Sequence, residues 1–237
     1  MNVIWHDLEC GAYAADLPLW RELAARHGDP VLDVGAGTGR VALDLASHGH
    51  HVTALDLDPL LLSELERRSE GLDVKTVLAD ARSFALEGRF ALILAPMQTV
   101  QLLGGRAGRD RFLRRARAHL REGGTLAVAI TEELDAFSPE DAVTLPLPDI
   151  RELDGVIYSS QPIAVRARPD GFVLERTRER VGIRGERSTE HDVIHLDRMT
   201  AGELVAEAAE AGFRHRMTKT IPATEDHVGG LVVILDG

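Results

Sequence analysis

Short apolar segments alternate with amphipathic helical segments over the first 131 residues, and this alternation limits the folds open to the chain. Several apolar segments carry hydrophobic residues at consecutive positions, which is typical of parallel strands covered on both faces. Parallel strands joined through helices form right-handed crossover units. The sequence therefore predicts an α/β fold with a doubly wound, mostly parallel sheet. The five predicted strands are residues 31–34, 51–57, 74–79, 90–95 and 125–131.

The pattern changes after this region. Residues 132–150 are rich in acids and Pro and are predicted as a loop, and three extended segments follow at 155–168, 171–183 and 189–196. They predict a three-stranded antiparallel meander, after which a helix with a Thr200–Glu203 capping box and two closing strands follow. We expect a core domain formed by residues 1–134 and 198–237. Residues 135–197 are expected to be inserted into it as a lid or dimer contact.

The composition restricts the class of protein. Of 237 residues, 44% are hydrophobic and 27% charged, which is typical of a globular chain. The formal charge of −11 argues against a nucleic-acid partner. Cys10 is the single cysteine, which excludes an internal disulfide and a cysteine-cluster zinc site, so no metal is expected. No signal peptide or membrane-spanning run is recognised, and we expect a cytoplasmic protein without membrane partners.

A glycine-rich turn follows the first predicted strand, in the segment VLDVGAGTGR at residues 31–40. Glycines there allow a tight turn and let a ligand approach the backbone closely. The dinucleotide fingerprint requires a third glycine at position 40, which is Arg40, whereas the third glycine is Gly39. The spacing, with Asp33 two residues before Gly35, departs from the nicotinamide pattern. An ordinary βα turn and a nicotinamide enzyme stay as alternatives.

Two acidic residues end the next two predicted strands. Asp56 lies 21 positions after Gly35, near the offset of about 20 expected for an acid that binds ribose hydroxyls. Asp80 ends the third strand, where its carboxylate can accept a hydrogen bond from an adenine amino group, and the N–H of Ala81 can donate to a ring nitrogen. Ligands of open α/β sheets bind at this carboxyl edge.

At these residues the sequence resembles the class I S-adenosylmethionine-dependent methyltransferases. The resemblance covers about residues 1–131 and 200–237, and it lies in VLDVGAGTG, ALDLD, LADARSF, FALILAPMQTV and LREGGTLAV taken in order. It implies a seven-stranded Rossmann-like sheet whose last strand is antiparallel, and S-adenosylmethionine as the cofactor. The residues it implies for cofactor binding are Tyr13, Gly35, Ala36, Gly37, Asp56, Leu57, Asp80, Ala81, Ala95 and Pro96.

The resemblance also implies the chemistry. Methyl transfer from a sulfonium is an in-line displacement that depends mainly on positioning the acceptor in a dry site. Aromatic side chains near a sulfonium can stabilise it, and Trp5, Tyr13 and Trp20 are the candidates. No N/D-P-P-Y/F motif follows the fourth strand, which argues against adenine or glutamine amide methylation. We therefore expect methylation of a small molecule at N or O.

The acceptor site is less well marked. Met97 and Gln98 after the fourth strand and Glu132 after the fifth are candidate substrate residues, although burial and solvation explain them equally. His191 and His195 share one face of a predicted strand, where a sheet-surface or interface role is favoured over a metal pair. His195 is the candidate for a catalytic proton relay.

Two other functions stay open. The stretch Arg106–Arg121 carries seven arginines that could bind RNA, although a solvated helix with an apolar inner face is favoured. The chain could also be a nucleotide-binding scaffold without catalysis. The sequence favours a small-molecule acceptor, and homodimerisation through the β insertion is a further hypothesis.

Overall fold

The structure is a computed structural model, and it describes residues 3–140, 145–224 and 227–237. The chain divides into two compact units. The first contains Tyr13–Glu132 and Met199–Gly237, and the second contains Asn2–Ala12 and Glu133–Arg198. Within the described residues, no helix combines the length and the apolar character that crossing a bilayer requires.

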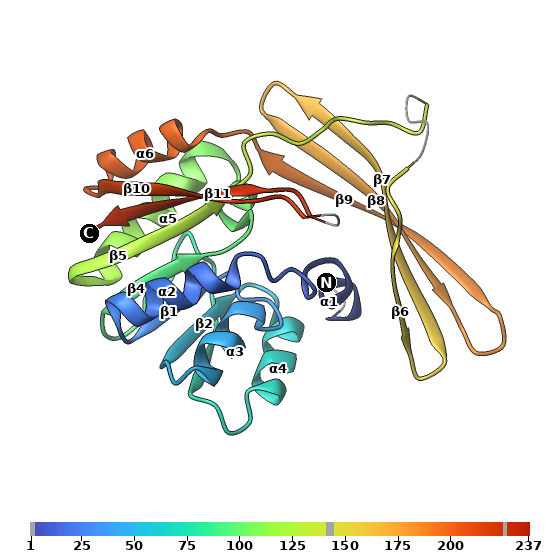
Figure 1. Ribbon diagram of the computed structural model, residues 1–237, viewed down its shortest axis with the longest axis horizontal. Helices are drawn as coiled ribbons and strands as arrows, with labels where there is room; N and C mark the ends of the chain where they lie inside the picture. The colour runs from blue at the N-terminus through green and yellow to red at the C-terminus, as the bar shows by residue number, and fades with distance from the viewer. Residues whose placement is uncertain (1–2, 141–144, 225–226) are drawn as a thin grey trace. The chain divides into compact units, whose positions relative to one another are not determined.

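A seven-stranded sheet forms the centre of the first unit, in the order β10-β11-β5-β4-β1-β2-β3 (Figure 1). The strands β1, β2, β3, β4 and β5 pair in parallel, whereas β11 pairs antiparallel with both β5 and β10. The expected doubly wound, mostly parallel sheet is therefore confirmed. Its strands are β1 (Val31–Val34), β2 (Val52–Asp56), β3 (Val74–Leu78), β4 (Phe90–Ala95), β5 (Leu120–Ile130), β10 (Arg214–Ile221) and β11 (Gly230–Asp236).

Helices cover both faces of this sheet because adjacent strand residues point to opposite sides. Leu92 packs into one hydrophobic cluster with residues of α2, α3 and α4, and its neighbour Ile93 packs into a second cluster with residues of α5 and α6. The strands are thus apolar at consecutive positions, as the sequence pattern indicated. The helices are α2 (Leu17–His27), α3 (Arg40–Ser47), α4 (Pro59–Arg68), α5 (Gly105–His119) and α6 (Ala201–Glu210), and a short 3₁₀ helix, η1, spans Thr99–Leu102.

The second unit contains a four-stranded antiparallel sheet in the order β6-β7-β8-β9, where the sequence predicted three strands. The additional strand, β6, begins inside the segment predicted as a loop. It is an edge strand joined to β7 by Asp154 and Gly155, which both have positive φ (51° and 75°). An Asp-Gly pair between two strands is a strong hairpin signal that the sequence reading missed. The strands are β6 (Asp149–Leu153), β7 (Val156–Arg168), β8 (Gly171–Val181) and β9 (Arg187–Asp197).

The N-terminal helix α1 (Val3–Cys10) packs on this second sheet, although the sequence reading grouped residues 1–134 with the core domain. The ring of Trp5 meets Tyr158 edge-on at 5.4 Å between centroids. The Glu9 carboxylate accepts hydrogen bonds from Ser160 (2.7 Å) and from two nitrogens of Arg178 (2.7 and 2.8 Å). Burial acts to raise the pKa of Glu9, but the bonds from Arg178 and Ser160 hold it below its ordinary value.

Candidate cofactor and acceptor site

The glycine loop after β1 requires its glycines. Gly35 and Gly37 have φ of +74° and +56°, a region that side chains disfavour. A Cβ on Gly35 would also lie 2.6 Å from Oγ1 of Thr99, the first residue of η1. The amides of Gly35 and Ala36 both donate to the carbonyl of Leu55 in β2, at 2.8 and 3.0 Å. The loop is therefore held against β2 on one side and Thr99 on the other.

Asp56, at the end of β2, contacts this loop directly. Its Oδ2 accepts the backbone N–H of Gly37 at 2.8 Å, and its Oδ1 accepts the N–H of Asp58 at 2.9 Å. Each carboxylate oxygen has a further lone pair for a ligand hydroxyl. The structure thus brings together the glycine loop and the acid that the sequence assigned to ribose, and it fixes the orientation of that acid.

Asp80, at the corresponding edge beyond β3, has a partner that the sequence reading did not include. The Arg82 guanidinium donates two hydrogen bonds to this carboxylate, from Nε to Oδ1 at 2.9 Å and from Nη2 to Oδ2 at 2.6 Å. The Arg82 backbone N–H also donates to Oδ1, at 2.8 Å. These bonds lower the pKa of Asp80 below its ordinary value, so the group is an ionised acceptor at neutral pH. The short Asp-x-Arg spacing could have indicated this pair. Ala81 between them is half-buried.

Apolar side chains lie beside these carboxylates. Leu57 directly follows Asp56 and is 64% exposed, and Leu78, which pairs with Asp56 across β2 and β3, is 59% exposed. Apolar groups beside oriented hydrogen-bonding groups are the combination that lines small-molecule sites. A flat heterocycle with a hydrogen-bond donor at its edge fits this combination.

Asp33 lies in β1, two residues before the glycine loop, and is 1% exposed. Neither of its carboxylate oxygens has a hydrogen-bond partner among the described residues. Burial, opposed by the positive charge of Arg40 and reinforced by Asp56, raises the pKa of Asp33 to about 7. A buried carboxyl without a partner indicates a position for a cationic or hydrogen-bonding ligand group.

The aromatic residues of the N-terminal segment differ in their roles. Tyr13 lies with its ring 5.1 Å from the Arg40 guanidinium, which donates to the Tyr13 carbonyl at 2.8 Å. Trp20 has no exposed surface and donates its indole N–H to Asp16 at 2.8 Å, so it cannot face a sulfonium. Trp5 packs within the second unit. The sequence hypothesis is wrong for Trp20, whose ring belongs to the hydrophobic core.

Asp16 directly precedes α2, but its side chain makes no capping hydrogen bond. Its carboxylate instead pairs with two nitrogens of Arg40 at 2.6 and 2.8 Å. Asp16 is thus the N-cap residue of α2 by position, but its carboxylate serves the buried guanidinium and indole, which both require this acceptor. Arg40, the residue that departs from the nicotinamide fingerprint, thus ties the start of α3 to the N-terminal segment.

The end of β4 forms the neighbouring part of the same edge. Ala95 is fully buried, and Met97, two residues on, adopts a positive φ of 54°. Such backbone strain in a non-glycine residue is concentrated at functional sites. The Gln98 amide donates to the hydroxyl of Thr131 at 2.9 Å, just beyond β5. Pro96 lies between Ala95 and Met97 and is buried.

Thr131 is held further by Gln101, whose side chain bonds both the N–H and the carbonyl of Thr131 (2.8 and 3.0 Å). Its neighbour Glu132 accepts the N–H of Ala201, the first residue of α6, at 2.6 Å. Glu132 therefore has a structural role at a helix N-terminus, where a carboxylate is favoured. Its assignment to a cationic substrate stays a prediction.

His191 and His195 lie on β9 in the second unit, and both are exposed. They project from the face opposite to Asp192, which bonds Arg178 under α1 at 2.9 Å. Among the described residues, no three acidic, histidine or cysteine side chains cluster as metal ligands would. The relay role of His195 stays a prediction.

The arginine-rich stretch forms α5, with Phe112, Leu113 and Ala116 fully buried. Several of its arginines bind within the protein. Arg109 forms a buried two-bond pair with Glu207 (both 2.8 Å), and Arg115 donates to the carbonyl of Phe84 at 2.6 Å. These arginines therefore join α5 to α6 and to the segment after β3.

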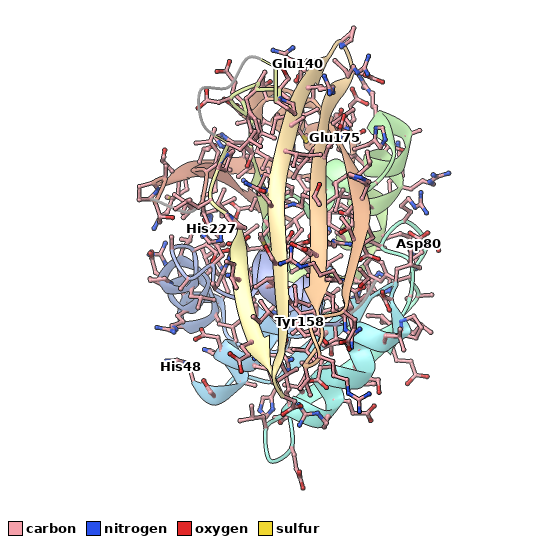
Figure 2. The ribbon with its side chains drawn as sticks, turned by 90° about the vertical axis from the view of Figure 1, so that its right-hand side faces the viewer. His48, Asp80, Glu140, Tyr158, Glu175 and His227 are labelled. Carbon is pink, nitrogen blue, oxygen red and sulfur yellow. The ribbon has the colours of Figure 1, made fainter. Side chains whose placement is uncertain are left out.

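His227 was not identified from the sequence. It lies in the connection between β10 and β11, and its imidazole is 5.0 Å from the Tyr13 ring, centroid to centroid. Figure 2 shows His227 and Asp80 on opposite sides of the molecule, in agreement with β10 and β3 being the two edges of the sheet. No motif precedes this histidine, so only the fold reveals its neighbour.

Comparison with known proteins agrees with this geometry. Residues 31–124 match a family model described as a methyltransferase domain. Over 123 residues the chain is 30% identical to a cypemycin N-terminal methyltransferase of a Streptomyces species, covering 51% of this chain and 50% of that protein. The chain spans half or less of the length of the curated relatives it matches.

Solved structures share the whole fold. The sugar N-methyltransferase KedS8 from a Streptoalloteichus species superposes with a TM-score of 0.76 at 20% identity, covering 98% of this chain and 91% of that one. The amino pentose methyltransferase CalS10 from Micromonospora echinaspora, solved with S-adenosylmethionine, superposes with a TM-score of 0.72 at 22% identity. The match covers 99% of this chain and 97% of that one. At these identities the likeness establishes the fold.

Residues 31–124 thus match a methyltransferase-domain model, and the fold agrees with that of solved methyltransferases. The similar structure of CalS10 contains S-adenosylmethionine as its cofactor. The residues present fit it, because the partnerless carboxyl of Asp33 suits its ammonium group and the oriented carboxylate of Asp56 suits its ribose.

Proposed function

We propose that the protein transfers a methyl group from S-adenosylmethionine to an amine nitrogen of a small molecule. The observation that carries this proposal is the Gly37–Asp56 contact at the carboxyl edge, flanked by Asp33 and Asp80 on the neighbouring strands. Three carboxyl groups, spaced along adjacent strand ends and accompanied by exposed leucines, match an elongated ligand with a cation at one end and an adenine at the other.

Each part of the cofactor has a proposed partner. Asp33 accepts from the methionine ammonium and Asp56 from the ribose hydroxyls. Asp80 accepts from the adenine amino group, with Leu57 against the ring and the Ala81 N–H on a ring nitrogen. The glycine loop permits close approach of the methionine part, and Ala95 and Pro96 border the sulfur. When bound, the cofactor supplies an electrophilic methyl group on a sulfonium.

The residues of the chain contribute positioning. Thr99 and Leu55 hold the glycine loop, so the bound methyl group has a defined direction. Met97 and the Gln98–Thr131 pair lie at the end of β4 and β5, where the acceptor is expected. The Gln98 carbonyl oxygen can accept an N–H of the acceptor, which leaves the nitrogen lone pair for the methyl group. Orientation of this kind can supply about 7–11 kcal/mol of the barrier reduction.

The groups at this edge favour nitrogen over oxygen. Alcohols hold their protons at neutral pH and need a strong base, whereas an amine releases its proton far more readily. Glu132, which follows the Thr131 partner of Gln98 in the chain, already binds the N-terminus of α6. The names of the similar proteins, a sugar N-methyltransferase, an amino pentose methyltransferase and an N-terminal methyltransferase, support an amine acceptor.

Calorimetry with S-adenosylhomocysteine tests the binding step, followed by a turnover assay with S-adenosylmethionine over a panel of amino sugars, peptide amines and phenols. We expect micromolar binding and methylation of amines. Binding without turnover on any member would favour the scaffold hypothesis. Absence of binding at millimolar ligand would refute the proposal.

An RNA acceptor is the second candidate, and Arg111 and its neighbours on α5 are the residues it would use. The internal partners of Arg109 and Arg115 weaken it. Retention on RNA that falls steeply with salt and disappears in Arg111→Ala would favour RNA over a small molecule.

Pairing of two copies through the β insertion also stays a prediction. The face of this sheet opposite α1 carries exposed apolar side chains, among them Ile150 (63%) and Val193 (52%). Sedimentation velocity of the wild type and of Val193→Lys tests this pairing. A wild type that sediments as a monomer would exclude it.

A further inference from the structure

We propose that His227 accepts the proton of the acceptor ammonium and so forms part of the catalytic site. The inference rests on the proposed function, because it assumes an amine acceptor at the carboxyl edge of the first sheet. It adds a catalytic group that neither the family motifs nor the sequence pattern marks. Three observations support it: the position of the histidine, its contact with Tyr13, and ring nitrogens that no described side chain or carbonyl bonds.

The strand register places His227 at the correct edge. In the antiparallel pair, Ile221 at the end of β10 lies opposite Gly230 at the start of β11. Leu231 in turn lies opposite Ile130, the last residue of β5. The connection that holds His227 therefore lies beyond the carboxyl end of β5. Since β5, β4 and β1 are parallel, this is also the edge of the glycine loop and of Met97.

A chain of contacts within the first unit joins His227 to the glycine loop. Arg40 directly follows Gly39, and its Nη1 donates to the carbonyl of Tyr13 at 2.8 Å. The Tyr13 ring, which is 9% exposed, contacts the imidazole of His227 at a tilt of 35°. These contacts connect the imidazole, through Tyr13 and Arg40, to the residue that directly follows the glycine loop.

The backbone of His227 is anchored while its ring nitrogens are available. Its N–H donates to Thr224 Oγ1 at 3.0 Å, and its carbonyl accepts the Thr224 N–H at 2.9 Å. Among the described residues, no side chain or carbonyl bonds the imidazole. By contrast, both ring nitrogens of His119 are bonded (2.7 and 3.0 Å), and His215 bonds Thr218 at 3.0 Å.

Within the described ranges, Arg40 and Asp16 are the charged groups that act on the Tyr13 ring. The Arg40 guanidinium lies over the Tyr13 ring, and Asp16 pairs with that guanidinium. Burial, with the Asp16 charge, raises the pKa of Tyr13, so its hydroxyl stays neutral and does not compete as a base.

The proposed step is balanced. The acceptor arrives as an ammonium and gives one proton to a neutral ring nitrogen of His227, which frees its lone pair. That lone pair forms the bond to the methyl carbon, and the electrons of the broken carbon–sulfur bond stay on sulfur. The methylated product leaves as an ammonium, and the imidazolium returns its proton to water.

Sinefungin tests this assignment without knowledge of the acceptor, because it carries a primary amine where the cofactor carries its sulfonium methyl. Dissociation constants for sinefungin and S-adenosylhomocysteine are measured by calorimetry at pH 7.5 in the wild type, His227→Ala and His227→Gln. His215→Ala serves as the matched control. The C2–H resonance of His227 is followed by NMR in the wild type with each ligand.

We expect His227→Ala to change the dissociation constant of S-adenosylhomocysteine by less than about twofold and to raise that of sinefungin about tenfold. The sinefungin constant of His227→Gln should lie between those of the wild type and His227→Ala. The His227 resonance should shift further with sinefungin than with S-adenosylhomocysteine. An unchanged ratio of the two constants, or equal shifts with both ligands, would overturn the role of His227 while leaving the proposed function intact. Failure of the wild type to bind either ligand would overturn both.

Discussion

The backbone N–H of Gly37 donates to the carboxylate of Asp56 at 2.8 Å, which joins the turn after β1 to the end of β2. Two segments 19 residues apart in the chain thereby become one rigid edge. The carboxylate is oriented before any ligand arrives. The conformational entropy of this side chain is therefore lost during folding rather than on binding.

Replacing Asp56 with alanine should weaken S-adenosylhomocysteine binding about 10- to 100-fold, since a hydrogen bond to a charged group contributes about 1.5–3 kcal/mol. The affinity of Asp56→Asn should lie between those of the wild type and Asp56→Ala, because asparagine retains one acceptor oxygen. Calorimetry provides the measurement. Asp73→Ala is the control, because Asp73 is exposed at the start of β3, on the opposite edge. Equal affinities for Asp56→Ala and the wild type would contradict the ribose role.

Gly35→Ala should destabilise the protein more than Gly88→Ala. Both positions have positive φ (+74° and +86°), so both variants carry backbone strain of about 1–2 kcal/mol. At Gly88 nothing lies within 4 Å of the added Cβ, whereas at Gly35 it would meet Thr99. The thermal midpoint should therefore fall further for Gly35→Ala, and Thr99→Ala in the same chain should restore part of the loss. Equal midpoints would mean that the loop can move away from Thr99.

Asp33 should make stability depend on pH. Its pKa is raised from 3.8 to about 7, so the folded state holds this proton more tightly than the unfolded state. The resulting stabilisation is fully present below pH 4 and is lost as the pH rises through 7. Asp33→Asn should therefore gain stability relative to the wild type between pH 4 and pH 8, by up to a few kcal/mol.

Thermal or urea unfolding across this pH range measures the effect of Asp33→Asn. The exposed Asp135 provides the control as Asp135→Asn. A difference between Asp33→Asn and the wild type that does not change with pH would show that Asp33 is ionised in both states.

Arg109→Ala should cost about 3–5 kcal/mol of unfolding free energy because it leaves the Glu207 carboxylate buried without its partner. Arg106→Ala, in the same helix and paired with the exposed Glu210, should lower the unfolding free energy far less, because water screens this pair. Urea unfolding of both variants provides the comparison. Similar costs for the two would indicate that the Arg109 pair is solvated.

Much of the fold could be read from the sequence because its strands are hydrophobic on both faces and its glycines fall at turns. Residues 31–40 marked the loop, and Asp56 followed at a characteristic offset. These are local patterns, set by backbone conformation and by burial, so neighbouring residues suffice to express them. The strand β6 was missed although Asp154-Gly155 marked its hairpin, since its exposed residues gave no apolar run.

Other features were decided only by the tertiary structure. The sequence cannot show that Arg40 pairs with Asp16, that Trp20 is buried against them, or that α1 packs on the second sheet, because these contacts join segments separated by tens of residues. His227 meets Tyr13 from the far end of the chain for the same reason. Local periodicity determines which segments become strands and helices, whereas the packing of those segments determines which polar side chains meet.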